Sequence, residues 1–121
     1  LTPLPGLLAV CRLEPKMPPP QWVYSGPLWA LTGTAEELSV VCAWEAVPDV
    51  VQRAGPWQAL MERGPLDFAL TGILSAIAAP LAGAELSIFA VSTFDTDYVL
   101  VRAECLEAAV SALRTAGITV D

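Results

Sequence analysis

Residues 86–102, LSIFAVSTFDTDYVLVR, contain two apolar runs separated by a polar segment. The runs LSIFAV (86–91) and YVLVR (98–102) are rich in the β-branched and aromatic residues that favour strands. Between them lies STFDTD (92–97), whose Ser, Thr and Asp are ordinary turn residues. The pattern predicts a β-hairpin with an aromatic side chain and two carboxylates at its tip. Two interpretations of that tip stay open at this point, a solvated turn or the polar wall of a pocket.

The sequence around this hairpin predicts a complete ferredoxin-like unit. WQALMER (57–63) predicts a strand, and apolar residues at helical spacing predict a helix over about 70–82. ECLEAAVSALRTAG (104–117) is an amphipathic helix pattern that ends at Gly117, and ITV (118–120) predicts a short last strand. The order strand-helix-strand-strand-helix-strand is the split βαβ plan.

The first half of the chain predicts mainly strands. LLAVCRL (7–13), LWALTG (28–33) and LSVVCAW (38–44) are apolar runs of strand length. EPKMPPPQ (14–21) predicts an extended polyproline connection, and PDVVQRAG (48–55) predicts a short helix at most.

An internal similarity links the two halves. LTGTAEELSVV (31–41) aligns with VSTFDTDYVLV (91–101) at an offset of 60, with the turn at the same place in both. A chance match of two apolar hairpins is the alternative to a duplication. We therefore expect an α+β fold of two fused ferredoxin-like lobes. Residues 1–56 form a degenerate copy without its first helix, and residues 57–121 form a complete copy, with terminal strands shared or exchanged between them.

Composition excludes several classes of function. The net charge of -7, with six basic residues in 121, argues against nucleic-acid binding. Hydrophobic residues make up 55% of the chain and mean hydropathy is +0.55, which indicates a well-filled core or a buried interface. The longest apolar run (69–84) is short for a membrane span and is interrupted by polar residues, Gly and Pro. We expect no membrane insertion.

The ionisable residues predict neither catalysis nor metal binding. The chain has no histidine, so Ser-His-Asp and Cys-His arrangements are absent, and its three cysteines are scattered. Cys11, Cys42 and Cys105 are expected to be free thiols in a reducing cytoplasm, since the first residues lack the pattern of a signal peptide. We expect a protein that is not an enzyme and uses no cofactor.

Two motifs support a family resemblance. GPLDFALTGIL (64–74) followed by STFDTDYVLV (92–101), inside a duplicated ferredoxin-like unit, resembles the ACT-domain family. More narrowly, the chain is similar to small tandem-ACT proteins akin to the regulatory region of aspartokinase and to cytosolic arginine sensors. The resemblance implies a non-catalytic regulatory module that binds a small ligand, usually an amino acid, where lobes or subunits meet. It also implies a homodimer, and its output would require an unidentified protein target.

The resemblance also implies the position of the ligand site. One wall would be the turn and start of the first long helix, and the other the hairpin tip. The expected ligand-binding residues are Leu66, Asp67, Phe68, Thr71, Gly72, Ser92, Thr93, Phe94, Asp95 and Asp97. Backbone N–H groups at Thr71–Gly72 suit a carboxylate, and Asp97 or Asp67 suits an ammonium group. The alternatives are a helix N-cap for Asp67, a solvated turn for Asp95 and hairpin structure for Asp97.

A second function stays open. A pure assembly module, which pairs through sheet edges or helices and binds no metabolite, would also explain the apolar excess.

Overall fold

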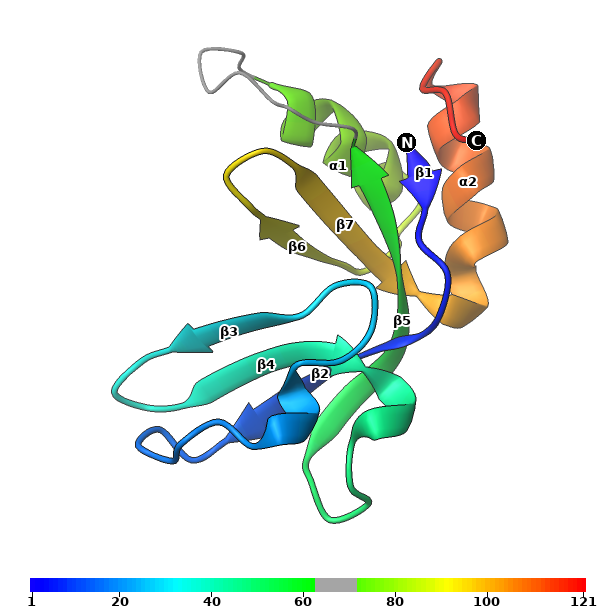
Figure 1. The fold of residues 1–121 in the computed structure, drawn as a ribbon. Helices are drawn as coiled ribbons and strands as arrows, with labels where there is room; N and C mark the ends of the chain where they lie inside the picture. Colours follow the sequence, from blue (N-terminus) through cyan, green and yellow to red (C-terminus); the bar gives the residue numbers. More distant parts are fainter. Residues whose placement is uncertain (63–71) are drawn as a thin grey trace. The chain divides into compact units, whose positions relative to one another are not determined.

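The computed structural model describes residues 1–62 and 72–121, which form two compact units (Figure 1). We call Pro5–Trp57 the N-terminal unit, and Gln58–Asp121 together with Leu1–Leu4 the C-terminal unit. Strand β5 (Arg53–Glu62) contributes its first half to the N-terminal unit and its second half to the C-terminal unit. The mixed α+β class with antiparallel strands, predicted from the sequence, is confirmed.

The N-terminal unit is an antiparallel sheet over a small apolar core. Its strands are β2 (Leu8–Leu13), β3 (Ala30–Gly33) and β4 (Leu38–Ala43), in the order β3-β4-β2-β5. Between β2 and β3 lies the 3₁₀ turn η1 (Gln21–Val23), and η2 (Trp44–Ala46) follows β4. Alternate strand residues point to the same face, so one face of β2 and β4 is continuously apolar. The core residues are Ala9, Cys11, Leu13, Val23, Leu38, Val40, Cys42 and Val47.

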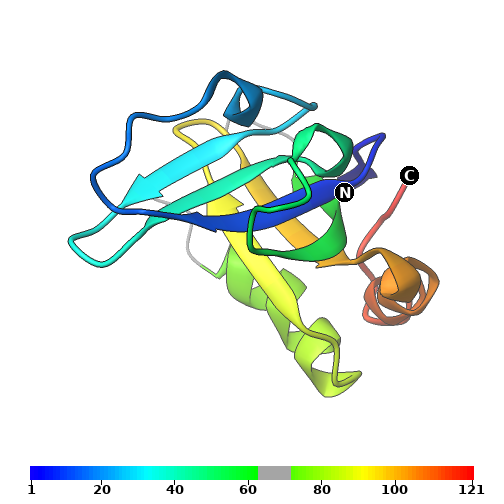
Figure 2. The ribbon, with the colours of Figure 1, turned by 90° about the horizontal axis from the view of Figure 1, so that it is seen from below.

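The C-terminal unit packs two helices on one face of its strands. Strands β7 (Asp97–Arg102) and β6 (Ile88–Ser92) follow β5 in the sheet, and β1 (Thr2–Pro3) also pairs with β5. Helices α1 (Ile73–Gly83) and α2 (Leu106–Thr115), the latter preceded by η3 (Ala103–Cys105), are visible in Figure 2. The core joins strand and helix residues: Leu60, Ile77, Leu81, Val99, Val101, Ala109, Leu113 and Val120. The helices therefore cover the sheet face that carries Val99 and Val101.

Two predicted elements are wrong. Residues 48–55 form no helix: a single turn, with the Val51 N–H donating to the Pro48 carbonyl at 3.0 Å, leads into β5. Val50 is 94% exposed, so the valines share no buried helical face. Residues 118–120 are not a strand, because β1 already pairs with β5. That tail bonds instead to Leu1, whose amino group donates to the Thr119 carbonyl at 2.7 Å.

Both helices end in the same hydrogen-bond pattern. After α2, the Ile118 N–H donates to the Leu113 carbonyl at 3.0 Å, and Gly117 between them has φ +87°. After α1, the Leu86 N–H donates to the Leu81 carbonyl at 3.0 Å, and the left-handed residue is Glu85, with φ +60°. This is the Schellman ending, whose left-handed position favours glycine because a Cβ there is strained.

The Glu85→Gly variant should therefore be more stable than the wild type. Removing the Cβ relieves left-handed strain, and we expect a gain of about 0.5–1 kcal/mol in the free energy of unfolding. Urea unfolding followed by circular dichroism measures it. Glu85→Ala retains the Cβ and is the control. A Glu85→Gly variant no more stable than Glu85→Ala would contradict the prediction.

Within residues 1–62 and 72–121, every helix is too short or too polar to cross a bilayer.

Candidate functional site

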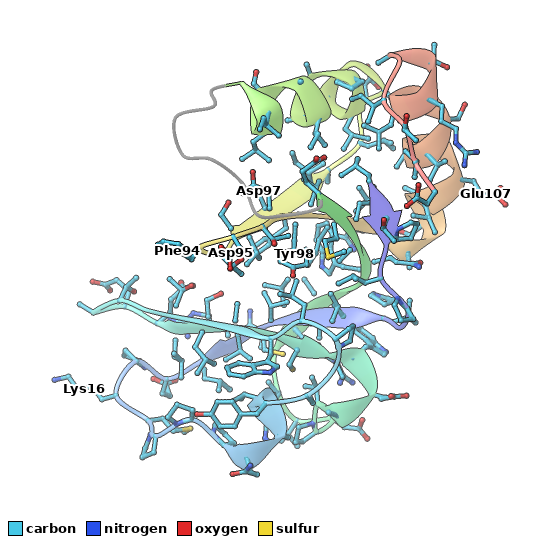
Figure 3. The ribbon with its side chains drawn as sticks, turned by 45° about the horizontal axis from the view of Figure 1, so that its top comes forward. Lys16, Phe94, Asp95, Asp97, Tyr98 and Glu107 are labelled. Carbon is cyan, nitrogen blue, oxygen red and sulfur yellow. The ribbon has the colours of Figure 1, made fainter. Side chains whose placement is uncertain are left out.

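The tip of the β6–β7 hairpin brings two of the expected site residues into direct contact. Ser92 lies opposite Asp97 in the strand register, and the Ser92 Oγ donates to the Asp97 Oδ1 at 2.6 Å. Asp97 lies on the same sheet face as Val99 and Val101, since side chains two apart on a strand share a face. Figure 3 shows the neighbouring Tyr98 directed to the opposite side. The Ser92–Asp97 pair is therefore on the face that the helices cover.

The turn itself is held by the Thr93 hydroxyl. The Thr93 N–H donates to the Thr96 carbonyl at 2.8 Å, and the Thr96 N–H donates to the Thr93 Oγ1 at 3.1 Å. Phe94 and Asp95 form the exposed apex, where the Phe94 side chain is 79% exposed (Figure 3). Thr93 thus maintains the turn, while Phe94 and Asp95 face the solvent side of the hairpin tip.

The β3–β4 turn of the N-terminal unit has the same hydrogen bonds as the β6–β7 turn. The Thr34 N–H donates to the Glu37 carbonyl at 2.9 Å, and the Glu37 N–H donates to the Thr34 Oγ1 at 3.1 Å. Thr34 corresponds to Thr93, and β4 begins at Leu38 where β7 begins at Asp97. The two turns therefore match at an offset of 59, one residue less than the 60 at which the sequences were aligned. A one-residue shift reverses which face each side chain occupies.

The start of α1 lies at the same end of the C-terminal unit as the hairpin tip (Figures 1 and 2). Residues 84–87 join the end of α1 to β6, and the chain reverses there, so the start of α1 and the end of β6 lie at the same end (Figure 1). Gly72 is the N-cap of α1, with φ +81°, and a Cβ built on it would have no heavy atom within 4 Å. As a glycine, Gly72 supplies no side-chain cap to the first-turn N–H groups of α1.

The other expected residues of this wall cannot be placed. Leu66, Asp67, Phe68 and Thr71 lie outside the described residues. The structure thus brings together Ser92 and Asp97 and places Gly72 at the same end of the unit.

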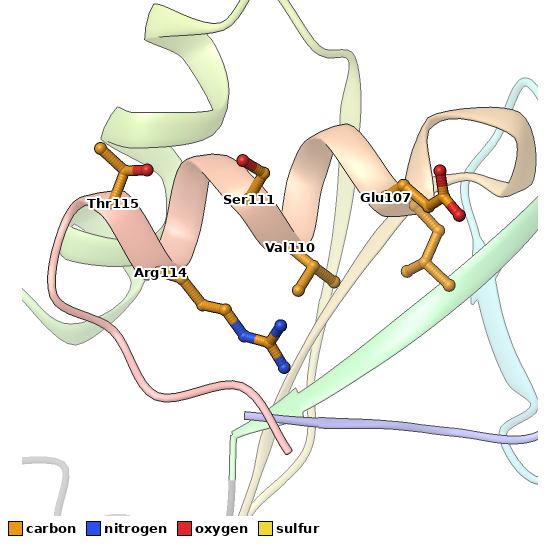
Figure 4. Close-up of a pocket in the computed structure, with 6 residues that line it drawn as sticks. Glu107, Val110, Ser111, Arg114 and Thr115 are labelled. Atoms are coloured by element: carbon orange, nitrogen blue, oxygen red, sulfur yellow. The ribbon is translucent and has the colours of Figure 1, made fainter.

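A separate groove of about 460 Å³ runs along the exposed face of α2 (Figure 4). It is lined by Leu106, Glu107, Val110, Ser111, Arg114 and Thr115. The Arg114 guanidinium is already engaged, since its Nη2 donates to the Val120 carbonyl at 2.8 Å. The groove contains none of the expected site residues. Its lining combines polar residues of the helix's solvent face with Leu106 and Val110, which also pack against the core.

Both thiols of the N-terminal unit are buried in its core. Cys11 lies opposite Val40, and Cys42 is two residues further along β4, so both thiols point into the same core. A hydrogen bond with Cys42, together with burial, raises the pKa of the Cys11 thiol. The raised pKa keeps the Cys11 thiol protonated at neutral pH, whereas the same hydrogen bond lowers the pKa of Cys42 to about 7. Among the described residues, no three Cys, Asp or Glu side chains are grouped to hold a metal ion.

Comparisons with known proteins agree with this division of the chain. The family model described as the ACT domain matches residues 54–115, just over half of the chain. A second model, of an N-terminal domain, matches residues 6–50. A search of curated protein sequences finds no match.

Two solved structures are similar to this chain. A protein from Agobacterium tumefaciens shares 35% identity and superposes with a TM-score of 0.92, covering 99% of this chain and 90% of that one. A protein of unknown function from Vibrio cholerae, described as a possible transport protein, shares 18% identity with a TM-score of 0.76. That match covers 94% of this chain and 86% of the Vibrio protein, and it supports the fold alone.

Proposed function

Because the chain belongs to the ACT-domain family, we propose that it is a non-catalytic regulatory module that binds an amino acid. ACT domains commonly bind small ligands in a regulatory role. The proposed site is the end of the C-terminal unit where the β6–β7 tip and the start of α1 lie. The Ser92–Asp97 pair on the helix-covered face is the observation that supports this position most strongly.

The two charged groups of a free amino acid suit the start of α1 and the carboxylate of Asp97. Its carboxylate would accept hydrogen bonds from the first-turn N–H groups of α1, where the helix dipole also favours negative charge. Gly72 leaves that approach open, since it has no side chain. The ammonium group would donate to Asp97, a charge-assisted contact.

Asp97 is suited to this role by its environment. The carboxylate is half-buried and accepts from Ser92 through Oδ1, which holds its orientation. A carboxylate has about four acceptor positions, so one bond from Ser92 does not exhaust it. The same bond is also what a purely structural hairpin would contain, and the experiment below separates the two roles.

The proposal extends to the surroundings of the site. The ligand would bind at the junction of lobes or subunits in a cytoplasmic homodimer built from two ACT-type repeats, as in the tandem-ACT proteins. The matching Thr34 and Thr93 turns support the repeat. Binding would be transmitted to a separate protein target.

The Asp97→Asn variant tests the proposal. Asparagine can still accept from Ser92, so the hairpin bond is retained while the charge is lost. In the wild type, one of the common amino acids at 100 times its dissociation constant should stabilise the fold by about 2.7 kcal/mol, measured by thermal shift. Losing the charge should weaken that binding about 10- to 100-fold in calorimetry, because hydrogen bonds to charged groups contribute about 1.5–3 kcal/mol.

Asp95→Asn, a change at the exposed neighbour, is the matched control and should bind like the wild type. Equal binding by the Asp97→Asn variant would show that the carboxylate only supports the hairpin. If no amino acid at millimolar concentration stabilised the wild type, the sensor proposal would fail and the assembly module would remain.

A further inference from the structure

The N-terminal unit exposes an aromatic pair at the two ends of a short loop. The rings of Tyr24 and Trp29 meet edge to face, with centroids 5.0 Å apart and planes at 86°. The two side chains remain 44% and 50% exposed. We call residues 24–29, YSGPLW, the aromatic loop. Exposed aromatic clusters of this kind are typical of interaction surfaces, because the rings offer large contact area at low entropic cost.

A cavity of about 250 Å³ adjoins the aromatic loop. The loop contributes Gly26 and Pro27 to its lining, and Leu7, Trp44 and Glu45 are also part of it. The loop lies tightly on β4, since a Cβ on Gly26 would come within 3.2 Å of Ala43. Glu45 is exposed and forms no ion pair with any described residue. This surface therefore combines aromatic rings, an apolar hollow and one unneutralised carboxylate.

The same unit carries a segment with complementary chemistry. Residues 16–20, KMPPP, which we call the proline segment, are neither helix nor strand. Pro20 has φ −63° and ψ 156°, close to the polyproline II conformation, and Pro18 and Pro19 are exposed. Aromatic-lined grooves bind polyproline II segments because these are already extended and lose little entropy on binding.

Lys16 gives this segment a charge that its own chain does not neutralise. Figure 3 shows the Lys16 side chain projecting away from the rest of its unit. It forms no ion pair within residues 1–62 and 72–121. It is also the single lysine of the sequence. A lysine beside prolines and a glutamate in the lining of the cavity that adjoins the aromatic loop are thus both available for contact with another molecule.

We propose that two copies of this chain associate by exchanging their proline segments. The prolines of one copy pack on Tyr24 and Trp29 of the other, and Lys16 of the first copy pairs with Glu45 of the second. In the proposed twofold arrangement each copy supplies both the aromatic loop and the proline segment, so the contact is made twice and the assembly closes as a dimer. Each chain carries a net charge of -7, so the copies repel at long range. The Lys16–Glu45 attraction then sets the register of the contact.

This surface includes no residue of the proposed ligand site, so amino-acid binding at that site and association through this surface are measured separately. Sedimentation velocity over a concentration series measures the association. Lys16→Glu and Glu45→Lys should each weaken it at least about tenfold, because like charges then face each other. The double reversal restores an opposite pair and should return the affinity to near that of the wild type. Glu36→Lys, an exposed reversal on the β3–β4 turn, makes the same charge change as Glu45→Lys and should resemble the wild type.

Trp29→Ser tests the aromatic contribution to the association separately, because it removes the indole ring and leaves the charges of Lys16 and Glu45 in place. It should weaken the association by at least as much as a single charge reversal. A wild type that is monomeric at every concentration would overturn the proposal, and so would a double reversal as weak as the single ones. A monomeric wild type that binds a synthetic peptide of residues 15–21 would also overturn it, since the occupant would then be a different protein.

Discussion

Leu81→Ala should lower the free energy of unfolding by about 3 kcal/mol, because it opens a cavity in the C-terminal core. Leu81 has no exposed surface and packs among residues of α1, α2 and the strands. Truncation removes buried methyl groups that the surrounding helices and strands cannot fully replace by relaxing, so the cost exceeds that of transfer alone. Alanine's higher helix propensity offsets only a few tenths of a kcal/mol.

Urea unfolding of Leu81→Ala and Val50→Ala separates burial from side-chain size. Val50 is 94% exposed, and its truncation should change stability by less than about 0.5 kcal/mol. If the two variants lost equal stability, Leu81 would not occupy the core.

Gly55→Ala should be the most damaging glycine substitution, with a loss of about 3 kcal/mol from backbone strain and overpacking. Gly55 has φ +131°, a conformation that side chains rarely adopt. A Cβ there would lie 2.8 Å from Trp57 Cδ1 and 3.1 Å from the Leu8 carbonyl oxygen. The backbone oxygen cannot rotate away, since β2 holds it in the sheet.

Gly33→Ala is the matched control. A Cβ on Gly33, at the end of β3, would have no heavy atom within 4 Å, so we expect a change below about 0.5 kcal/mol. Tryptophan fluorescence in urea can follow both variants, because Trp44 and Trp57 lie in the same unit as Gly55. A Gly55→Ala protein as stable as Gly33→Ala would show that this backbone is not constrained as described.

The hairpin and the amphipathic helix were predictable because their signals are local. Two apolar runs rich in β-branched and aromatic residues around a Ser-Thr-Asp turn define β6 and β7, and Gly117 marks the end of α2. The sequence alignment at an offset of 60 matched apolar residues, whereas the two turns match at 59. The hydrogen bonds of Thr34 and Thr93, which define the turns, are visible only in coordinates.

The errors at the other elements arose because local sequence patterns do not show which segments contact each other over a long range. The helix expected at 48–55 depended on valine spacing, but Val47 and Val51 reach the core from a turn, where the same spacing occurs. The pairing of Thr2–Pro3 with Met61 and Leu60 is a long-range contact with no pattern in two residues of sequence. At the site, Ser92 bonds to Asp97 because the strand register places them opposite each other. The sequence pattern predicts the hairpin, but it does not determine that register to within one residue.

Amide chemical-shift mapping during titration with the stabilising amino acid tests the central claim most directly. If the ligand binds between the β6–β7 tip and the start of α1, the largest changes should occur at residues 72–75 and 92–97. Changes confined to the α2 groove at Val110–Arg114, or spread over the N-terminal unit, would contradict the account.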